Sequence, residues 1–159
     1  MNTRTTKLED ASLWLYVSIM SYLTCMAFHG LCVHGSSCSR GVEILAFGWL
    51  GVFYGHSTNL TWLANPLLFN AWALILLRKR RAAIIGSIAA FVGGFLFLVF
   101  SNMDGVEVDE GGGDYPVTGY GVGYWLWLVS MICAFIASLR LNSGVVWNAD
   151  NDDAAQQSQ

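Results

Sequence analysis

The amino-acid sequence predicts an all-α integral membrane protein: a bundle of four transmembrane helices with one short helix that does not cross. Two observations of composition lead to this prediction. Of the 159 residues, 55% are hydrophobic and only 12% are charged, whereas an average soluble domain has about 25% charged residues. Seven Trp, nine Phe and six Tyr accompany just 8 Lys and Arg and 11 Asp and Glu. Charged groups are therefore too few to wet the surface of a soluble domain of this length.

Three uncharged stretches are long enough to cross a bilayer. A hydrocarbon core of roughly 30 Å requires about 20 apolar residues in a helix, and a helix satisfies its own backbone polar groups within lipid. Residues 11–33, residues 82–100 and residues 122–139 contain no Lys, Arg, Asp or Glu. We therefore predict that each of the three stretches forms a transmembrane span.

A fourth uncharged stretch, residues 44–77, is interrupted by Gly55-His56-Ser57-Thr58-Asn59. Helices and lipid both disfavour such a sequence, so the stretch is predicted to divide in two. Residues 60–77 form the remaining span, while residues 44–54 are too short to cross and form a re-entrant or interfacial half-helix between the first and second spans. The alternative is a fifth crossing by residues 42–62, which would place glycines and polar side chains in lipid.

The distribution of charge predicts which side of the membrane each connection faces. The run Arg78-Lys79-Arg80-Arg81 lies between the second and third spans, whereas the connection over residues 101–121 has no Lys or Arg and five acidic residues. By the positive-inside rule the basic turn is cytoplasmic and the acidic connection faces outward. Residues 1–141 are then expected to form one polytopic domain of a bacterial inner membrane, with both termini in the cytoplasm. Residues 142–159 are expected to be a flexible tail.

One face of the first predicted span carries polar side chains. At about 100° of rotation per residue, these side chains fall within one arc of roughly 100°. They either bond across the helix bundle, away from lipid, or line a hydrated path or binding cleft. Packing is favoured, because ion paths usually contain a carboxylate or a base and only His29 can carry charge here. The residues are Ser18, Ser21, Tyr22, Cys25, His29 and Cys32.

The second predicted span contains a polar group that requires partners elsewhere in the protein. A buried amide in hydrocarbon is costly unless it is hydrogen-bonded. Either Asn65 caps a helix whose first residue is Pro66, or the helix continues through a proline kink. Pockets lined by broken helices have such unsatisfied polar groups. We therefore predict a pocket at Trp62, Asn65 and Asn70, together with the polar face of the first span.

Small residues recur at every fourth position of the third and fourth predicted spans. They allow helix backbones to approach closely, which favours helix association in lipid. The sequence leaves open whether each ridge packs within this chain or against a second copy. The ridges are Ala82, Gly86, Ala90 and Gly94, and Ser130, Ala134 and Ser138.

Two cysteines lie close together at the outer end of the first span. In an oxidising compartment Cys32 and Cys38 are predicted to form a disulfide that closes a short loop. A metal site is the alternative, but the spacing of the cysteines and histidines matches none of the regular zinc patterns. We predict no metal and no cofactor, and we expect Cys25 and Cys133 to be buried thiols.

The outward connection is rich in carboxylates around Gly111-Gly112-Gly113. Five carboxylates could hold calcium, but their order does not match the EF-hand pattern. A solvated loop with short strands near residues 106–108 and 115–117 is favoured, and a partner could dock there. The acidic residues are Asp104, Glu107, Asp109, Glu110 and Asp114.

The sequence contains no catalytic signature, and its short basic run and net charge of −3 give no support for a nucleic-acid partner. We therefore expect a non-enzymatic membrane protein that acts by binding: an accessory, sensor or immunity-type protein for a membrane or periplasmic partner. The bilayer and either a protein partner or a second copy are its expected contacts. The alternative is a subunit of a small oligomeric channel or carrier, with a path along the polar face of the first span and Asn65/Asn70.

Overall fold

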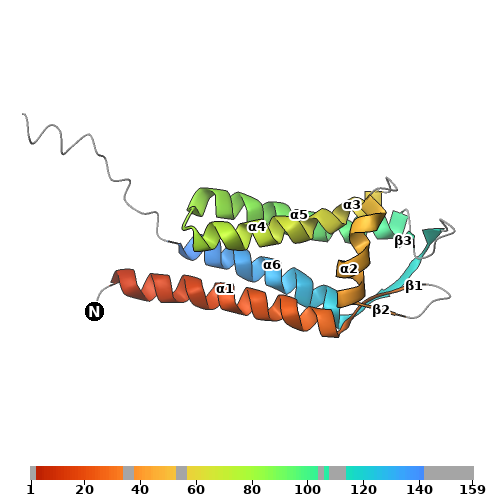
Figure 1. Cartoon of the computed structure of the whole chain (residues 1–159), viewed down its shortest axis with the longest axis horizontal. Helices are drawn as coiled ribbons and strands as arrows, with labels where there is room; N and C mark the ends of the chain where they lie inside the picture. Colours follow the sequence, from red (N-terminus) through yellow and green to blue (C-terminus); the bar gives the residue numbers. More distant parts are fainter. Residues whose placement is uncertain (1–2, 34–37, 53–56, 104–105, 108–113, 142–159) are drawn as a thin grey trace, which may run out of the picture.

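The computed structural model describes residues 3–33, 38–52, 57–103, 106–107 and 114–141. The prediction of a mostly helical fold is confirmed. Three long helices run side by side along the long axis of the molecule (Figure 1): α1 (Thr3–Ala27), α5 (Arg80–Met103) and α6 (Val122–Arg140). The predicted tail, residues 142–159, lies outside the described residues.

Shorter helical elements complete the bundle. Helix α3 (Ser57–Leu60), the 3-10 turn η2 (Thr61–Leu63) and helix α4 (Ala64–Leu76) follow one another and cover nearly all of the residues predicted for the second span. Helix α2 (Gly41–Gly51) takes the place of the predicted half-helix. In Figure 1, α2 crosses the end of the bundle at which α3 begins.

Two small antiparallel sheets correct the all-α prediction. Strand β1 (His29–Val33) lies between β2 (Ser39–Arg40) and β5 (Val117–Tyr120). Strands β3 (Val106–Glu107) and β4 (Asp114–Tyr115) form the second sheet.

The prediction that residues 11–33 form one helix is therefore wrong at its outer end. Helix α1 ends at Ala27, and the chain then turns to give the backbone N–H of Gly41 a bond to the carbonyl oxygen of Phe28, at 3.0 Å. Leu31 and Val33 are buried in β1. Pairing with two neighbouring strands supplies their segment with the backbone hydrogen bonds that a longer helix would have made.

The small-residue ridges pack within this chain over most of their length, whereas Ala82 at the start of the α5 ridge is exposed. On α6, the side chains of Ser130, Ala134 and Ser138 have no exposed surface, and this helix packs along α1 (Figure 1). On α5, a Cβ atom added at Gly86 would lie 3.5 Å from the Cβ atom of Ala71 on α4. Close approach of backbones at small residues therefore holds α1 to α6 and α4 to α5.

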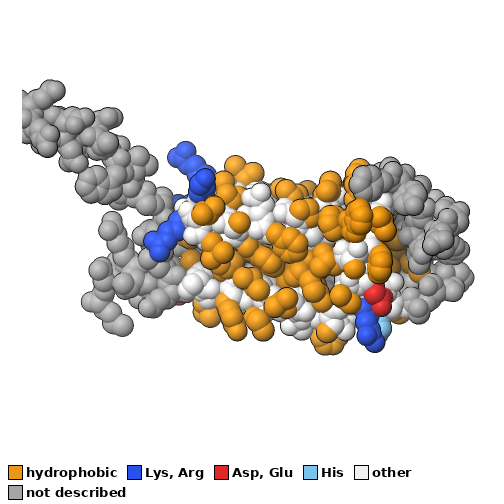
Figure 2. Space-filling model, in the orientation of Figure 1, with side chains coloured by type: hydrophobic (Ala, Val, Ile, Leu, Met, Phe, Trp, Pro, Cys, Tyr) orange, Lys and Arg blue, Asp and Glu red, His pale blue; other side chains and the backbone are white. Residues whose placement is uncertain are grey.

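Among the described helices, α5 and α6 are each long and apolar enough to cross a membrane by length and composition. Figure 2 shows hydrophobic side chains over the middle of the visible face, with Lys and Arg side chains at one end and a further basic side chain, beside an acidic one, towards the other end. Large apolar side chains on α5 point outward, and Ile85 is 68% exposed. The length and composition of these two helices therefore support association of the chain with a membrane.

Candidate functional site

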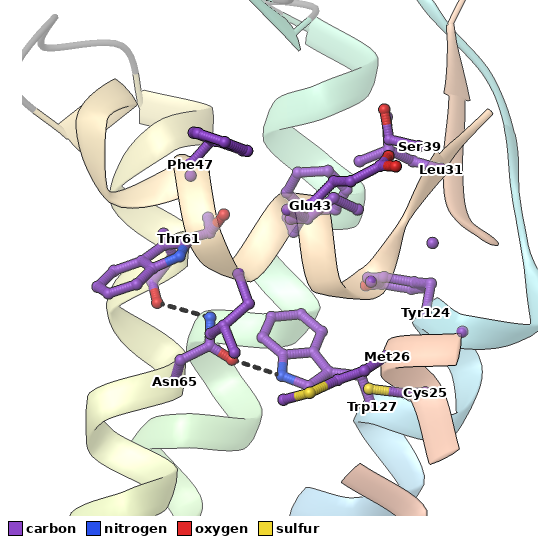
Figure 3. A pocket seen from close by; sticks show the side chains of 18 of the residues that line it. Cys25, Met26, Leu31, Ser39, Glu43, Phe47, Thr61, Asn65, Tyr124 and Trp127 are labelled. Atoms are coloured by element: carbon purple, nitrogen blue, oxygen red, sulfur yellow. Dashed lines mark hydrogen bonds between the residues drawn. The ribbon is translucent and has the colours of Figure 1, made fainter. Parts of the chain in front are cut away.

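A cavity of about 430 Å³ lies at the end of the bundle next to α2. Ligand pockets commonly have volumes of roughly 300–1,000 Å³ and predominantly apolar walls. Figure 3 shows Glu43 and Phe47 of α2 on one side of this cavity and Cys25 and Met26 of α1 on another. The apolar and aromatic part of the wall includes Met26, Leu31, Ile44, Phe47, Phe97 and Tyr124.

The Asn65 side chain makes three hydrogen bonds in the polar part of the cavity wall. Its Oδ1 atom accepts hydrogen bonds from Tyr22 Oη, at 3.1 Å, and from Trp127 Nε1, at 2.9 Å. Its Nδ2 atom donates to the backbone oxygen of Trp62 at 3.1 Å (Figure 3). The Asn65 side chain is buried and thus links α1, α4 and α6, with both acceptor positions of its oxygen occupied.

The polar face of α1 is used largely for bonds inside the bundle. Ser18 Oγ donates to the backbone oxygen of Ser130 at 2.7 Å and accepts a bond from Trp72 Nε1 at 2.9 Å. Cys25 Sγ lies 3.0 Å from the backbone oxygen of Tyr22. These partners satisfy polar groups that would otherwise be costly to bury, and they favour the packing interpretation of this face.

The structure brings together only some of the residues predicted for the pocket. Tyr22, Cys25, Trp62 and Asn65 line the cavity. The remaining predicted residues do not line it: Ser18 is buried in the bundle, Ser21 is half-buried, and His29 and Asn70 are exposed.

Helix geometry explains why the side chains of Asn65 and Asn70 lie on different sides of α4. Five residues at about 100° each place the two side chains roughly 140° apart around the helix. Helix α4 already begins at Ala64, and its N-cap residue is Leu63. The alternative in which Asn65 caps the helix is therefore wrong, and Pro66 lies within the first turn, where its missing N–H costs no helical bond.

Two polar side chains of the cavity wall, Thr58 and Asn59, were not identified from the sequence, and they lie near the predicted residue Trp62. Thr58 is only 2% exposed, and its Oγ1 atom has no hydrogen-bond partner. The buried Nδ2 atom of Asn59 and the buried Nε1 atom of Trp62 also lack partners. All three residues line the cavity, so one wall contains hydrogen-bonding capacity that the described chain does not use.

A glycine in α2, Gly48, allows this helix to lie close to the cavity wall. A Cβ atom added at Gly48 would lie 2.5 Å from Cδ1 and 3.1 Å from Nε1 of Trp62. Only glycine therefore allows α2 to lie against the indole ring without displacing it. The helix begins with a bond from the backbone N–H of Arg40 to the Glu43 carboxylate, at 2.9 Å.

The two cysteines predicted to pair are joined in the structure by a disulfide between Cys32 in β1 and Cys38. Cys25 and Cys133 are free and buried. No group of three or more His, Cys, Asp and Glu residues suited to a metal ion occurs within the described ranges.

The acidic connection is described only in part. Glu107 and Asp114 are paired across β3 and β4, whereas Asp104, Asp109 and Glu110 lie outside the described residues. The calcium and partner-docking interpretations of this connection therefore both remain hypotheses.

Comparisons with protein-family models, with curated proteins and with solved structures found no match to this chain. The function is therefore inferred from the geometry and chemistry of the molecule itself. Two features bear on it directly. One is the hydrogen-bonded interior around Ser18 and Asn65, and the other is the cavity beside α2.

Proposed function

We propose that the chain is a four-span membrane protein that acts by binding and not by catalysis, as an accessory, sensor or immunity-type protein of a bacterial inner membrane. One observation carries the proposal: the polar side chains of α1 are bonded inside the bundle, while the cavity is confined to one end. Ser18 bonds to α6 and α4, and Tyr22 bonds to Asn65. An interior closed in this way suits a binding protein better than a conduction path.

Charge supports the membrane part of the proposal. The turn between α4 and α5 carries the run Arg78-Lys79-Arg80-Arg81, and α6 ends at Arg140. Arg140 lies 3.6 Å from Asp10 of α1, so these helix ends meet at one end of the bundle. By the positive-inside rule this basic end faces the cytoplasm, and the cavity end with its disulfide faces outward.

A channel or carrier is the competing function. It would need the α1 face hydrated and open over the length of the bundle. The bonds that Ser18 and Asn65 make inside the bundle oppose this, and Asn70, which was also part of the predicted path, is exposed on the outer side of α4. The binding function is therefore preferred.

Labelling of single cysteines tests the four-span topology. In a variant without the four native cysteines, Gly112→Cys should react with an impermeant thiol reagent added outside intact cells, and Ser143→Cys should not. Both should react after permeabilisation, which controls for accessibility of each thiol. Labelling of Ser143→Cys from outside would show that α6 does not cross, and would overturn the proposed topology.

Flux measurements distinguish binding from transport. We expect liposomes that contain the purified chain to conduct ions and small solutes no faster than protein-free liposomes. Ser21→Leu places a bulky apolar group on the α1 face, and Asn70→Leu is the matched change on the outer side of α4. Saturable or voltage-dependent flux that Ser21→Leu abolishes without loss of protein would contradict the binding function and favour a path along α1.

A further inference from the structure

We infer that the cavity beside α2 binds a neutral, mainly apolar molecule of the bilayer that carries carbonyl-type oxygen acceptors. This inference rests on the proposed membrane location and names the kind of ligand that the binding function involves. The argument uses three properties of the cavity: its charge, the unused donors in its wall, and its position next to an apolar groove on the outside of the bundle.

The charge of the cavity excludes anionic ligands. Glu43 is the one charged side chain among the described residues that line it. This carboxylate is exposed and accepts a bond from the backbone of Arg40. A carboxylate or phosphate group would have no cation to pair with here and would lie near a like charge, which disfavours binding in an apolar site. A neutral molecule avoids both costs.

The unused hydrogen-bonding groups specify acceptors on the ligand. Asn59 Nδ2 and Trp62 Nε1 are donors only, and Thr58 Oγ1 can donate as well as accept. A buried polar group without a partner is costly, so these groups favour an occupant that can accept hydrogen bonds. Carbonyl oxygens of a quinone ring or of an ester provide such acceptors without charge.

The three groups also lie close together in sequence, within one turn of chain at α3 and η2. These unpartnered groups therefore lie together in one part of a mainly apolar and aromatic wall, in which the Thr61 and Asn65 side chains are bonded within the chain. A ligand with its oxygen atoms at one place and an apolar body elsewhere matches this arrangement.

An apolar groove beside the cavity provides a lateral route from the bilayer. It is lined by Trp49, Val52, Trp62 and Leu63, and Trp62 also lines the cavity. The outward side chains around it are hydrophobic, and Trp49 is 46% exposed. Lipid would cover these side chains if the bundle is embedded, so a lipophilic molecule can pass from the bilayer to the Trp62 ring without entering water.

Binding of defined probes to the purified full-length chain tests the inference. Four probes are compared by native mass spectrometry and by tryptophan fluorescence: decylubiquinone, dioctanoylglycerol, dodecanoate and dodecane. We expect one equivalent of a carbonyl-bearing neutral probe, with at least tenfold weaker binding of dodecanoate and of dodecane. Tighter binding of decylubiquinone assigns a quinone, and tighter binding of dioctanoylglycerol assigns an ester lipid.

Substitutions in the wall identify the site of binding. Thr58→Val and Asn59→Leu each remove a polar group, and each should weaken binding of the preferred probe by about tenfold, the effect of one hydrogen bond. Trp62→Phe keeps an aromatic ring but removes Nε1, and a similar loss is expected. Asn70→Leu is the matched control, because it removes an exposed amide outside the cavity, and its affinity should equal that of the wild type.

Several results would overturn the inference. They are an absence of bound probe at saturating concentration, equal binding of dodecane or dodecanoate, and unchanged affinity in the folded Thr58→Val and Asn59→Leu proteins. The comparison of probes on the wild type does not depend on any variant folding. If no probe binds while the topology is as proposed and no flux is seen, only the ligand proposal is refuted. Flux through the wild-type protein would instead contradict the binding function itself.

Discussion

The two ends of the helix bundle differ in the size of the side chains between their helices. Near the α4–α5 turn, the helices meet through Ala83, Ala134, Ala137 and Ser138, all of which have no exposed surface. Near α2, the wall between the same helices contains tryptophan, tyrosine and phenylalanine and encloses a cavity of about 430 Å³. We refer to these regions as the packed end and the cavity end.

The packed end and the cavity end show how one bundle can combine stability with binding. Small side chains at the packed end let backbones approach closely and leave no room for a ligand. At the cavity end, bulky aromatic rings line the wall, and polar groups there have no partners. Stabilising contacts and binding capacity are therefore separated along the length of the molecule, and substitutions at the two ends should have different effects.

The largest expected effect is at the packed end. Ala134→Leu adds bulk where α6 packs and no surface is exposed, so it should lower the free energy of unfolding by about 3 kcal/mol. Denaturant titration of the purified protein measures this loss. The control is Ile132→Leu on the same helix, where the side chain is 43% exposed. Equal stability of the two variants would show that the packed end is not tightly packed.

The second effect is at the boundary between the ends. Asn65→Leu leaves Tyr22 Oη and Trp127 Nε1 without their acceptor and should lower the free energy of unfolding by about 2 kcal/mol. The matched change, Asn70→Leu, removes an exposed amide and should cost nothing in detergent micelles or bilayers. A larger loss in Asn70→Leu than in Asn65→Leu would contradict the arrangement of α4 described above.

A smaller effect on stability is expected where α2 meets the cavity. In Gly48→Ala, the new methyl group must displace the Trp62 ring, while alanine favours the helix by about 1 kcal/mol. The two effects should nearly cancel in the free energy of unfolding, but tryptophan emission and probe affinity should both change. Gly119→Ala is the control, because a Cβ atom there meets nothing within 4 Å. An unchanged emission spectrum in Gly48→Ala would contradict the contact.

The sequence predicted the helical elements well because the period and length of apolar stretches are local properties. Helices α5 and α6 begin and end within a few residues of the predicted spans. The end of α1 could not be predicted in this way. The segment from His29 to Val33 is as apolar as a helix end, and it becomes a strand by pairing with residues 39–40 and with residues 117–120, which lie far along the chain.

The candidate site was predicted only in part, because some of its residues give no local signal in the sequence. Tyr22 and Asn65 are conspicuous as polar residues within apolar stretches, and they do meet. Thr58 and Asn59 lie in a stretch whose polarity is typical of a loop, so their burial in a cavity wall gives no local signal. Asn70 looked equivalent to Asn65, but helical rotation places it on the outer side of α4.

The central claim is that the unpartnered polar groups of the cavity wall serve binding and not folding, and Thr58→Val tests it most directly. The substitution replaces an unpartnered buried hydroxyl with a methyl group of similar size. Without ligand, it should raise the free energy of unfolding by about 1 kcal/mol, because a desolvation cost is removed. Ser18→Ala, which breaks bonds to Ser130 and Trp72, should lower it. A clear loss of stability in ligand-free Thr58→Val would contradict the claim.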